Sequence, residues 1–346
     1  MRWDLFCRVI DNFGDIGVCW RLARDLAGRG ETVRLWVDDP SALRWMAPAG
    51  HSAVELVHWT ASPPLLAPGD VVIEGFGCDP PASFVQAMHD KPPLWLNLEY
   101  LSAEDYVERS HALPSPQLSG PGAGLTKWFF YPGFTPRTGG LLREPGLMGQ
   151  REGFDRGAWW AEHAVARREG ERVVSVFCYD DAPLAALGRA LAASGPTLLL
   201  LTPGPAQRLA EAAWPDGPPE GLRLQRLPLL SQDGFDHLLW SCDLNFVRGE
   251  DSFVRAQWAG VPFVWHIYPQ SDGAHAAKLD AFLMRLQPSR LVQLLWRAWN
   301  GLAPWPGAWP NEARWADATL RWRERLLAQN DLTSQLLRFV AEKRLK

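Results

Sequence analysis

The sequence lacks any long uninterrupted run of apolar residues, and this absence argues against a membrane-spanning helix. It has no run of lysine or arginine, and its formal net charge is −4, which argues against a nucleic-acid-binding protein. The opening stretch contains no apolar region of the kind that directs a chain to export. We therefore expect a soluble cytoplasmic protein that binds neither membranes nor nucleic acids.

Groups that could hold a metal ion are also scarce. The five cysteines are scattered singly among apolar neighbours, and the eight histidines show no paired spacing. No Asp-x-Asp triplet occurs anywhere in the chain. These patterns predict buried, reduced thiols, no catalytic metal ion and no cofactor.

The chain does contain enough apolar material to form real cores. Apolar residues make up 47% of its 346 residues and charged residues 21%, which is typical of a globular protein rather than a disordered one. A chain of this length usually forms two domains. Nineteen tryptophans add large apolar surfaces that we expect to lie in cores or interfaces.

The most informative stretch is 243–270. A short apolar run, a break at Arg248, helically spaced apolar residues and a second apolar run predict a strand, a tight turn, a helix and another strand. Such a turn binds anions through free backbone N–H groups, to which Arg248 adds a cation and Ser252 a hydroxyl. An ordinary helix N-cap is the alternative interpretation. The carboxylate of Glu250 favours a ligand that carries hydroxyl groups or a neutral ring as well as phosphate.

The amino-terminal stretch predicts a similar unit, with a strand, a polar loop over 11–17 and a helix over 18–27. The loop lacks the Gly-x-Gly pair of dinucleotide-binding proteins, and Asp11 and Asp15 lie where a pyrophosphate would approach. Two convergent carboxylates suit general base catalysis or the binding of a guanidinium. The alternative is that one aspartate caps the helix and the other is solvated.

Strands and helices alternate along the chain and predict two α/β domains, 1–150 and 151–330, with a final helix within 331–346 that packs back on the first domain. Two facing Rossmann-like domains with an interdomain cleft form the GT-B fold of glycosyltransferases. The expected strands are 5–10, 32–37, 71–73, 94–98, 173–179, 197–201, 222–227, 244–247 and 263–267. Further expected helices are 81–89, 155–168, 235–240 and 332–343, and the Pro- and Gly-rich segment 113–146 is expected to be an ordered loop.

Four segments carry a resemblance to a known family: DLFCRVIDNFGDIGVCWRLARDLA, LNLEYLSAEDYVE, KWFFYPGFTPRTGGLLRE and RGEDSFVRAQWAGVPFVWHIYPQ. They resemble the EarP family of protein-arginine rhamnosyltransferases, which modify translation elongation factor P. The resemblance implies a GT-B fold and dTDP-β-L-rhamnose as the donor substrate. It also implies an inverting, metal-independent transfer to one arginine of elongation factor P, which activates that factor.

The resemblance implies roles for individual residues. Asp15 corresponds to the general base, Asp11 to a residue that helps to hold the acceptor loop, and Glu250 to a third catalytic carboxylate. Leu229 stands where some relatives carry an aromatic residue. The positions that correspond to donor-binding residues are Asn12, Phe13, Gly14, Phe177, Tyr179, Gln232, Phe235, Arg248, Asp251, Ser252, Tyr268 and Gln270; for Phe177 and Phe235, core packing is the alternative.

The predicted chemistry is consistent with these acids, because a guanidinium keeps its proton at neutral pH and is a poor nucleophile. A carboxylate can orient one of its nitrogens and take the proton as the C–N bond forms. Two other functions stay open at this stage. One is a GT-B glycosyltransferase with a different nucleotide sugar or a small-molecule acceptor, and the other is a non-catalytic protein that binds a translation factor.

Overall fold

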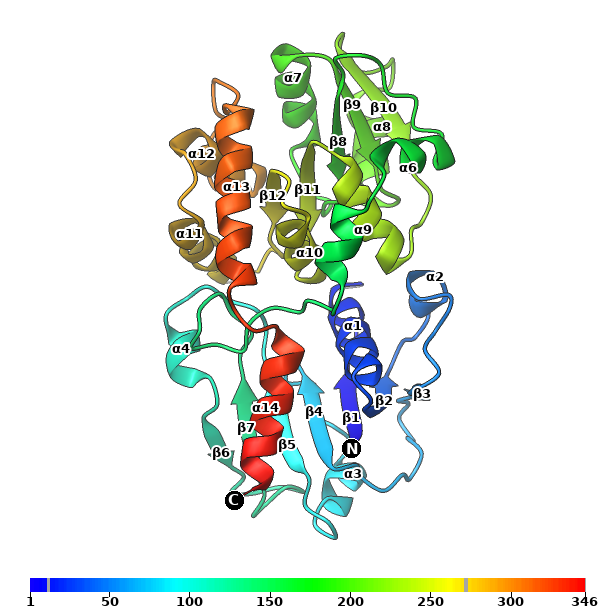
Figure 1. Ribbon diagram of the computed structural model, residues 1–346, viewed down its shortest axis with the longest axis vertical. Coiled ribbons are helices and arrows are strands. Elements are labelled where there is room, and N and C mark those ends of the chain that lie inside the picture. The colour runs from blue at the N-terminus through cyan, green and yellow to red at the C-terminus, as the bar shows by residue number, and fades with distance from the viewer. Residues whose placement is uncertain (11–12, 271–272, 346) are drawn as a thin grey trace. The chain divides into compact units, whose positions relative to one another are not determined.

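The computed structural model describes residues 1–10, 13–270 and 273–345. The chain forms two compact units (Figure 1). Unit 1 comprises Met1–Pro145 and Ala328–Lys346, and unit 2 comprises Gly146–Leu327.

Unit 1 is built on a seven-stranded sheet with the order β3-β2-β1-β4-β5-β7-β6. Neighbouring strands pair in parallel, except that β6 runs antiparallel to β7. The direction in which strands are added reverses between β1 and β4, as in a Rossmann fold. The strands are β1 (Arg2–Cys7), β2 (Thr32–Val37), β3 (Val54–His58), β4 (Val71–Gly75), β5 (Leu94–Leu98), β6 (Pro114–Pro116) and β7 (Thr126–Phe130).

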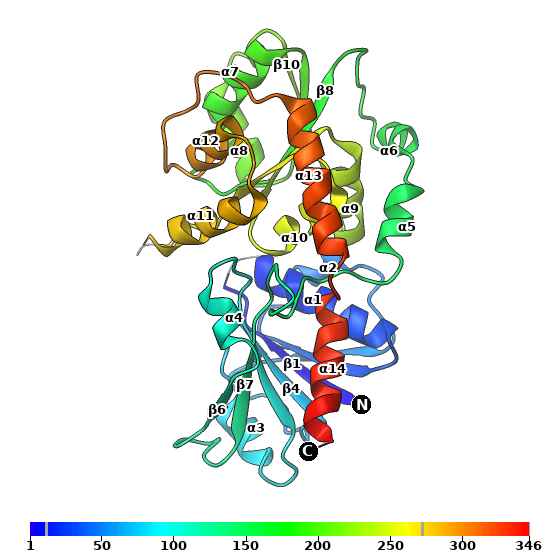
Figure 2. The same ribbon diagram turned by 60° about the vertical axis from the view of Figure 1, so that its left-hand side comes forward.

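Helices cover both faces of this sheet. Helices α1 (Gly14–Gly28) and α14 (Leu332–Arg344) pack together on one face and share a core that includes Leu26 and Leu336. Figure 2 shows α14, in red, running along the strands of unit 1. Helix α3 (Ala82–Ala87) covers the other face, where Phe84 packs against Phe6 and Trp36. The last helix thus belongs to unit 1, since its apolar face completes that unit's core. The short helices of this unit are α2 (Leu43–Met46) and α4 (Tyr106–Ser110).

Unit 2 repeats the same plan with five parallel strands in the order β10-β9-β8-β11-β12. Its strand order reverses between β8 and β11. The strands are β8 (Arg172–Val176), β9 (Thr197–Leu201), β10 (Leu222–Arg226), β11 (Leu244–Arg248) and β12 (Phe263–His266). The helices are α5 (Leu147–Glu152), α6 (Arg156–Glu162), α7 (Leu184–Ser194), α8 (Pro205–Ala213), α9 (Gln232–Ser241), α10 (Asp251–Ala259), α11 (Ala274–Leu286), α12 (Arg290–Trp299) and α13 (Glu312–Leu327).

Several predicted elements were wrong. The segment 113–146 is not only loop, because it contributes β6 and β7 to the sheet of unit 1. The predicted helix over 155–168 ends at Glu162, and Ala164 has a left-handed backbone (φ 50°), which a helix cannot continue through. The predicted strand over 173–179 ends at Val176, so the three residues that follow lie outside the strand, although the N–H of Phe177 still donates to the carbonyl oxygen of Phe246 in β11. Strand β1 likewise ends at Cys7 rather than at Ile10.

Among the described residues, no helix combines the length and the apolar character needed to cross a lipid bilayer.

Candidate active site

The predicted site residues fall into two sets, one in each unit, and each set includes residues that follow the strands at which the order of the sheet reverses. Asp15 follows β1 in unit 1, whereas Phe177 and Tyr179 follow β8 and Arg248 ends β11 in unit 2. Ligands of doubly wound sheets bind beyond the carboxyl ends of the strands at this point, because the loops diverge there. Asp11 and Asn12 lie outside the described residues.

Asp15 lies in the first turn of α1 and is only 2% exposed. Its Oδ2 atom accepts the backbone N–H of Ile10 at 2.9 Å, and its Oδ1 atom accepts the hydroxyl of Tyr100 at 3.3 Å. The N-cap of α1 is Phe13, which makes no side-chain cap. Asp15 therefore does not cap the helix as an N-cap residue would. Two donors from different segments fix the orientation of its carboxylate.

Tyr100, which sequence reasoning did not select, connects Asp15 to the end of β5. Its ring stacks on Phe76 at 4.3 Å with an interplanar angle of 12°, and Phe76 directly follows β4. The preceding residue, Glu99, accepts a hydrogen bond from the Asn97 amide at 2.7 Å. Burial raises the pKa of Glu99 above its ordinary value, against the opposing effect of a nearby lysine. The signal in the sequence is a pair of polar residues placed directly after a buried strand.

Phe13 and Gly14, which the resemblance assigns to donor binding, have structural surroundings of their own. The ring of Phe13 packs edge-on against Trp45 at 5.0 Å, and Gly14 is the first residue of α1. Their predicted contact with the donor stays a prediction.

Arg248 is the central cation of the set in unit 2. Its guanidinium carbon lies 4.4 Å from the ring centroid of Phe177 and 4.7 Å from that of Tyr179. The Nη1 atom donates to the carbonyl oxygen of Cys178 at 3.0 Å. The side chain is 6% exposed, so two aromatic rings and one carbonyl hold a buried positive charge in place.

The turn after Arg248 leads directly into α10. Gly249 has φ 63°, a left-handed conformation that favours glycine, and Glu250 is the N-cap without a side-chain cap bond. The hydroxyl of Ser252 donates to the carbonyl oxygen of Arg248. The predicted role of that hydroxyl as an anion donor therefore competes with a contact inside the protein. The backbone N–H groups of the first turn of α10 are the remaining donors.

The residues predicted for the nucleoside form a partly open aromatic and polar group. Phe177 and Phe235 meet edge to face at 5.4 Å, with both rings only partly buried. Gln232, in the first turn of α9, is buried and donates to Asp251 Oδ2 at 3.3 Å. Leu229 is 53% exposed, so it does not belong to the core.

Tyr268 and Gln270 follow β12 and are exposed. The ring of Tyr268 meets that of Tyr179 edge to face at 5.5 Å, which joins it to the aromatic group around Arg248. The backbone N–H of Gln270 donates to His275 Nδ1 at 3.2 Å. The structure thus brings Tyr268 together with the predicted donor residues, whereas the described part of the chain shows no such contact for the side chain of Gln270.

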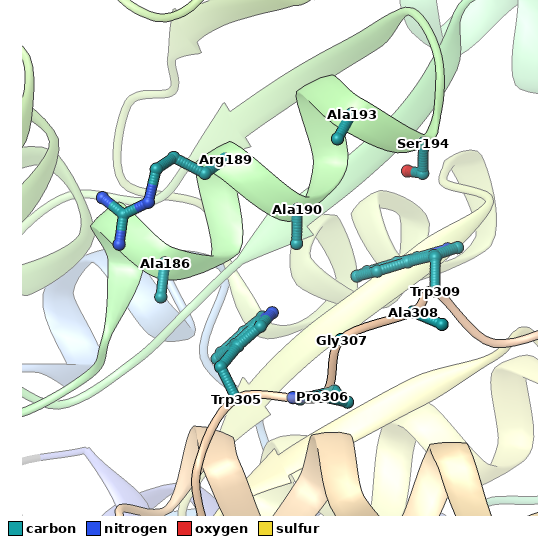
Figure 3. A pocket seen from close by; sticks show the side chains of 10 residues that line it. All are labelled: Ala186, Arg189, Ala190, Ala193, Ser194, Trp305, Pro306, Gly307, Ala308 and Trp309. Atoms are coloured by element: carbon teal, nitrogen blue, oxygen red, sulfur yellow. The ribbon is translucent and has the colours of Figure 1, made fainter.

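A separate hollow of about 590 Å³ lies in unit 2 between α7 and the segment 305–309 (Figure 3). Three alanines of α7 and the indoles of Trp305 and Trp309 line it. Its lining includes none of the described residues predicted to bind the donor. Within the described parts of the chain, no group of three or more His, Cys, Asp and Glu residues could hold a metal ion.

A family model described as "Elongation-Factor P (EF-P) rhamnosyltransferase EarP" matches residues 3–341. The chain belongs to the EarP family. A curated relative from Pseudomonas putida, named protein-arginine rhamnosyltransferase, is 46% identical over 97% of this chain and 98% of its own length. A solved structure described as the structural basis for EarP-mediated arginine glycosylation of translation elongation factor EF-P is 34% identical, with a TM-score of 0.70 over 99% of both chains.

This EarP-family chain is also similar in fold to the glycosyltransferase of kitacinnamycin, with a TM-score of 0.56, 15% identity and 97% of each chain covered. The predicted GT-B fold with two Rossmann-like domains is therefore confirmed, and the chain is a glycosyltransferase. The individual roles of the predicted EarP site residues stay predictions.

Proposed function

We propose that this EarP-family enzyme transfers L-rhamnose from dTDP-β-L-rhamnose to an arginine side chain of elongation factor P with inversion at the anomeric carbon. The observation that carries the proposal is the pair of oppositely charged side chains at the two reversal points, the fixed carboxylate of Asp15 and the fixed guanidinium of Arg248. The curated relatives named protein-arginine rhamnosyltransferase support the reaction type. The solved EarP relative, which is described by arginine glycosylation of translation elongation factor EF-P, supports the acceptor.

Asp15 would act on the acceptor. Its carboxylate binds the acceptor guanidinium, orients one nitrogen and takes the proton that this nitrogen loses. The nitrogen attacks the anomeric carbon from the side opposite the leaving group. The C–N bond forms as the C–O bond to dTDP breaks, so one displacement inverts the configuration.

Arg248 would act on the donor. The departing dTDP gains negative charge on its diphosphate, and the guanidinium of Arg248 with the N–H groups of α10 stabilises that charge. The partly exposed rings of Phe177 and Phe235 offer faces for the thymine base. Because protein groups supply the positive charge, the proposal includes no metal ion and no cofactor.

The test is mass spectrometry of purified elongation factor P after incubation with the enzyme and dTDP-β-L-rhamnose. We expect a mass increase of one deoxyhexose on a single arginine, and none on a variant of the acceptor in which lysine replaces that arginine. Nuclear magnetic resonance of the glycopeptide should show the inverted anomer. Transfer from UDP-glucose at an equal rate, or transfer to a small molecule but not to elongation factor P, would contradict the proposal.

A further inference from the structure

His266, the last residue of β12, is a buried imidazole that contacts the segment after β8. It is 2% exposed. Its Nδ1 atom accepts the backbone N–H of Tyr179 at 3.2 Å, and its Nε2 atom lies 3.3 Å from Oδ1 of Asp181. The two rings of His266 and Tyr179 also meet edge to face at 5.2 Å. One side chain therefore holds two points of the loop that carries Tyr179.

The hydrogen bonds of His266 define its tautomer in this arrangement. Nδ1 accepts an N–H and so carries no proton, which places the proton of the neutral ring on Nε2, facing Asp181. The hydrogen bond from His266 is the main cause that lowers the pKa of Asp181 below its ordinary value. The imidazole thus accepts on one side and donates on the other.

The backbone around His266 holds the turn that follows Arg248. The carbonyl oxygen of His266 accepts the N–H of Gly249 at 3.3 Å, and the indole of Trp265 donates to the carbonyl oxygen of Gly249 at 2.7 Å. Asn300, which caps the end of α12, donates to Trp265 O at 2.8 Å and accepts the N–H of Ile267 at 2.9 Å. Asn300 therefore fixes the end of β12 from outside the predicted donor site. The end of β12, through His266 and Trp265, fixes the turn that follows Arg248.

We propose that His266 is a positioning residue for the donor: it holds the backbone at Tyr179 so that the Tyr179 ring stays against Arg248, without itself touching the nucleotide sugar. This inference rests on the proposed function, because it assumes that the group around Arg248 binds the donor. The ring of Tyr179 is one of the two that flank the guanidinium, so movement of its backbone would open one side of that arrangement.

Three substitutions separate the two hydrogen bonds. His266→Asn keeps an acceptor oxygen near the position of Nδ1, His266→Gln keeps a donor near that of Nε2, and His266→Phe keeps neither. We expect the KM for dTDP-β-L-rhamnose to rise about 3- to 10-fold in the Gln and Phe variants, the scale of one neutral hydrogen bond, and to stay within about 2-fold in the Asn variant. The kcat should stay within about 2-fold in all three. His163→Phe, which alters a ring stacked on Trp159 in unit 2, is the matched control and should leave both constants unchanged.

A second readout needs no donor. The chain has five tyrosines, so labelling with ¹⁵N-tyrosine gives five backbone amide signals, of which Tyr179 is one. The Tyr179 amide should shift and exchange faster with solvent in the Gln and Phe variants and remain near its wild-type position in the Asn variant.

The two readouts separate the possible failures. If wild-type protein neither binds dTDP nor transfers rhamnose, the proposed function fails, while the amide signal still reports whether His266 holds Tyr179. If donor binding is normal and the Asn, Gln and Phe variants share the same KM, or if the Tyr179 signal does not move in the Gln variant, the positioning role is overturned. Should the Phe variant not fold, the comparison of Asn with Gln still decides.

Discussion

Replacement of Asp15 by asparagine tests the proposed general base with a small change in structure. The amide oxygen can accept the N–H of Ile10, as Oδ2 does now, and the amide nitrogen can donate to the Tyr100 oxygen. The local contacts can therefore persist in Asp15→Asn, whereas the negative charge and the capacity to take a proton are lost.

The expected effect on turnover is larger than the expected effect on stability. Conversion of two charge-assisted hydrogen bonds to neutral ones costs about 1 kcal/mol each, within the roughly 5–15 kcal/mol stability of a typical domain. Loss of a general base lowers the rate by about 100-fold or more, which corresponds to about 3 kcal/mol in the barrier. Most of the protein should stay folded while most of the activity disappears.

The assay is single-turnover transfer of rhamnose to elongation factor P, followed by mass spectrometry, with dTDP binding measured separately by calorimetry. Asp25→Asn is the matched control, because Asp25 lies in the same helix, is buried and pairs with Arg29. We expect it to lower the melting temperature but not the turnover of the folded enzyme. Donor affinity should change little in Asp15→Asn. Transfer by this variant within a few-fold of wild type would remove Asp15 from the mechanism.

Four further predictions follow from other parts of the structure. Arg248→Ala should weaken dTDP binding in calorimetry by about 10-fold or more, the scale of a lost charge-assisted contact; an unchanged Kd would place the diphosphate elsewhere. Ser252→Ala should weaken dTDP binding by no more than about 3-fold. The Ser252 hydroxyl already donates to the Arg248 carbonyl, so the substitution removes less than one net hydrogen bond to the ligand. A loss of affinity as large as that of Arg248→Ala would contradict this prediction. Phe339→Ala should destabilise unit 1 by about 3–5 kcal/mol in urea unfolding, because the buried Phe339 ring packs on two aromatic residues of β7. As a control, Leu320→Ala on the surface of α13 should have little effect on stability. Burial lowers the pKa of His111 to about 4 from an unfolded value of 6.5. Between these two pH values the unfolded chain binds more protons than the folded chain, so the free energy of unfolding should fall as the pH decreases from 6.5 to about 4. His111→Phe should reduce this pH dependence of the urea midpoint, and an unaltered dependence would refute the assignment.

The sequence predicted the buried parallel strands best, because their apolar runs are short and bounded by polar residues. The observed strands β2, β5 and β9 have the predicted bounds. Strand β7 was missed because prolines and glycines flank it on both sides, and only pairing with β5 makes it a strand. Strand β3 lies at the edge of its sheet and is mostly exposed, so its alternation gave no strong apolar signal.

The sequence predicted which segments form the candidate site, but it did not predict the contacts that their side chains make. The turn at Arg248 and the loop at Asp15 were identified from polar residues that follow apolar runs. The contact of Asp15 with Ile10 is local, but its contact with Tyr100 joins positions 85 residues apart in the sequence, and no local pattern contains it. His266 was missed for the same reason, since a histidine that ends a buried strand has the local pattern of a core residue. Its proposed role comes from partners in the loop after β8, Tyr179 and Asp181.

The charges at the start of α10 decide which group must hold the diphosphate. A helix N-terminus favours an anion, but here Glu250 is the N-cap and Asp251 occupies the first turn, so two carboxylates lie beside the N–H groups of that turn. These two carboxylates repel an anion and so offset much of the attraction that the helix dipole supplies. The guanidinium of Arg248 is fixed one residue before the turn, against the rings of Phe177 and Tyr179 and the carbonyl oxygen of Cys178. The attraction for an anion at this turn therefore depends on Arg248 more than on α10, which is why its substitution, rather than that of Ser252, should have the larger effect on donor affinity.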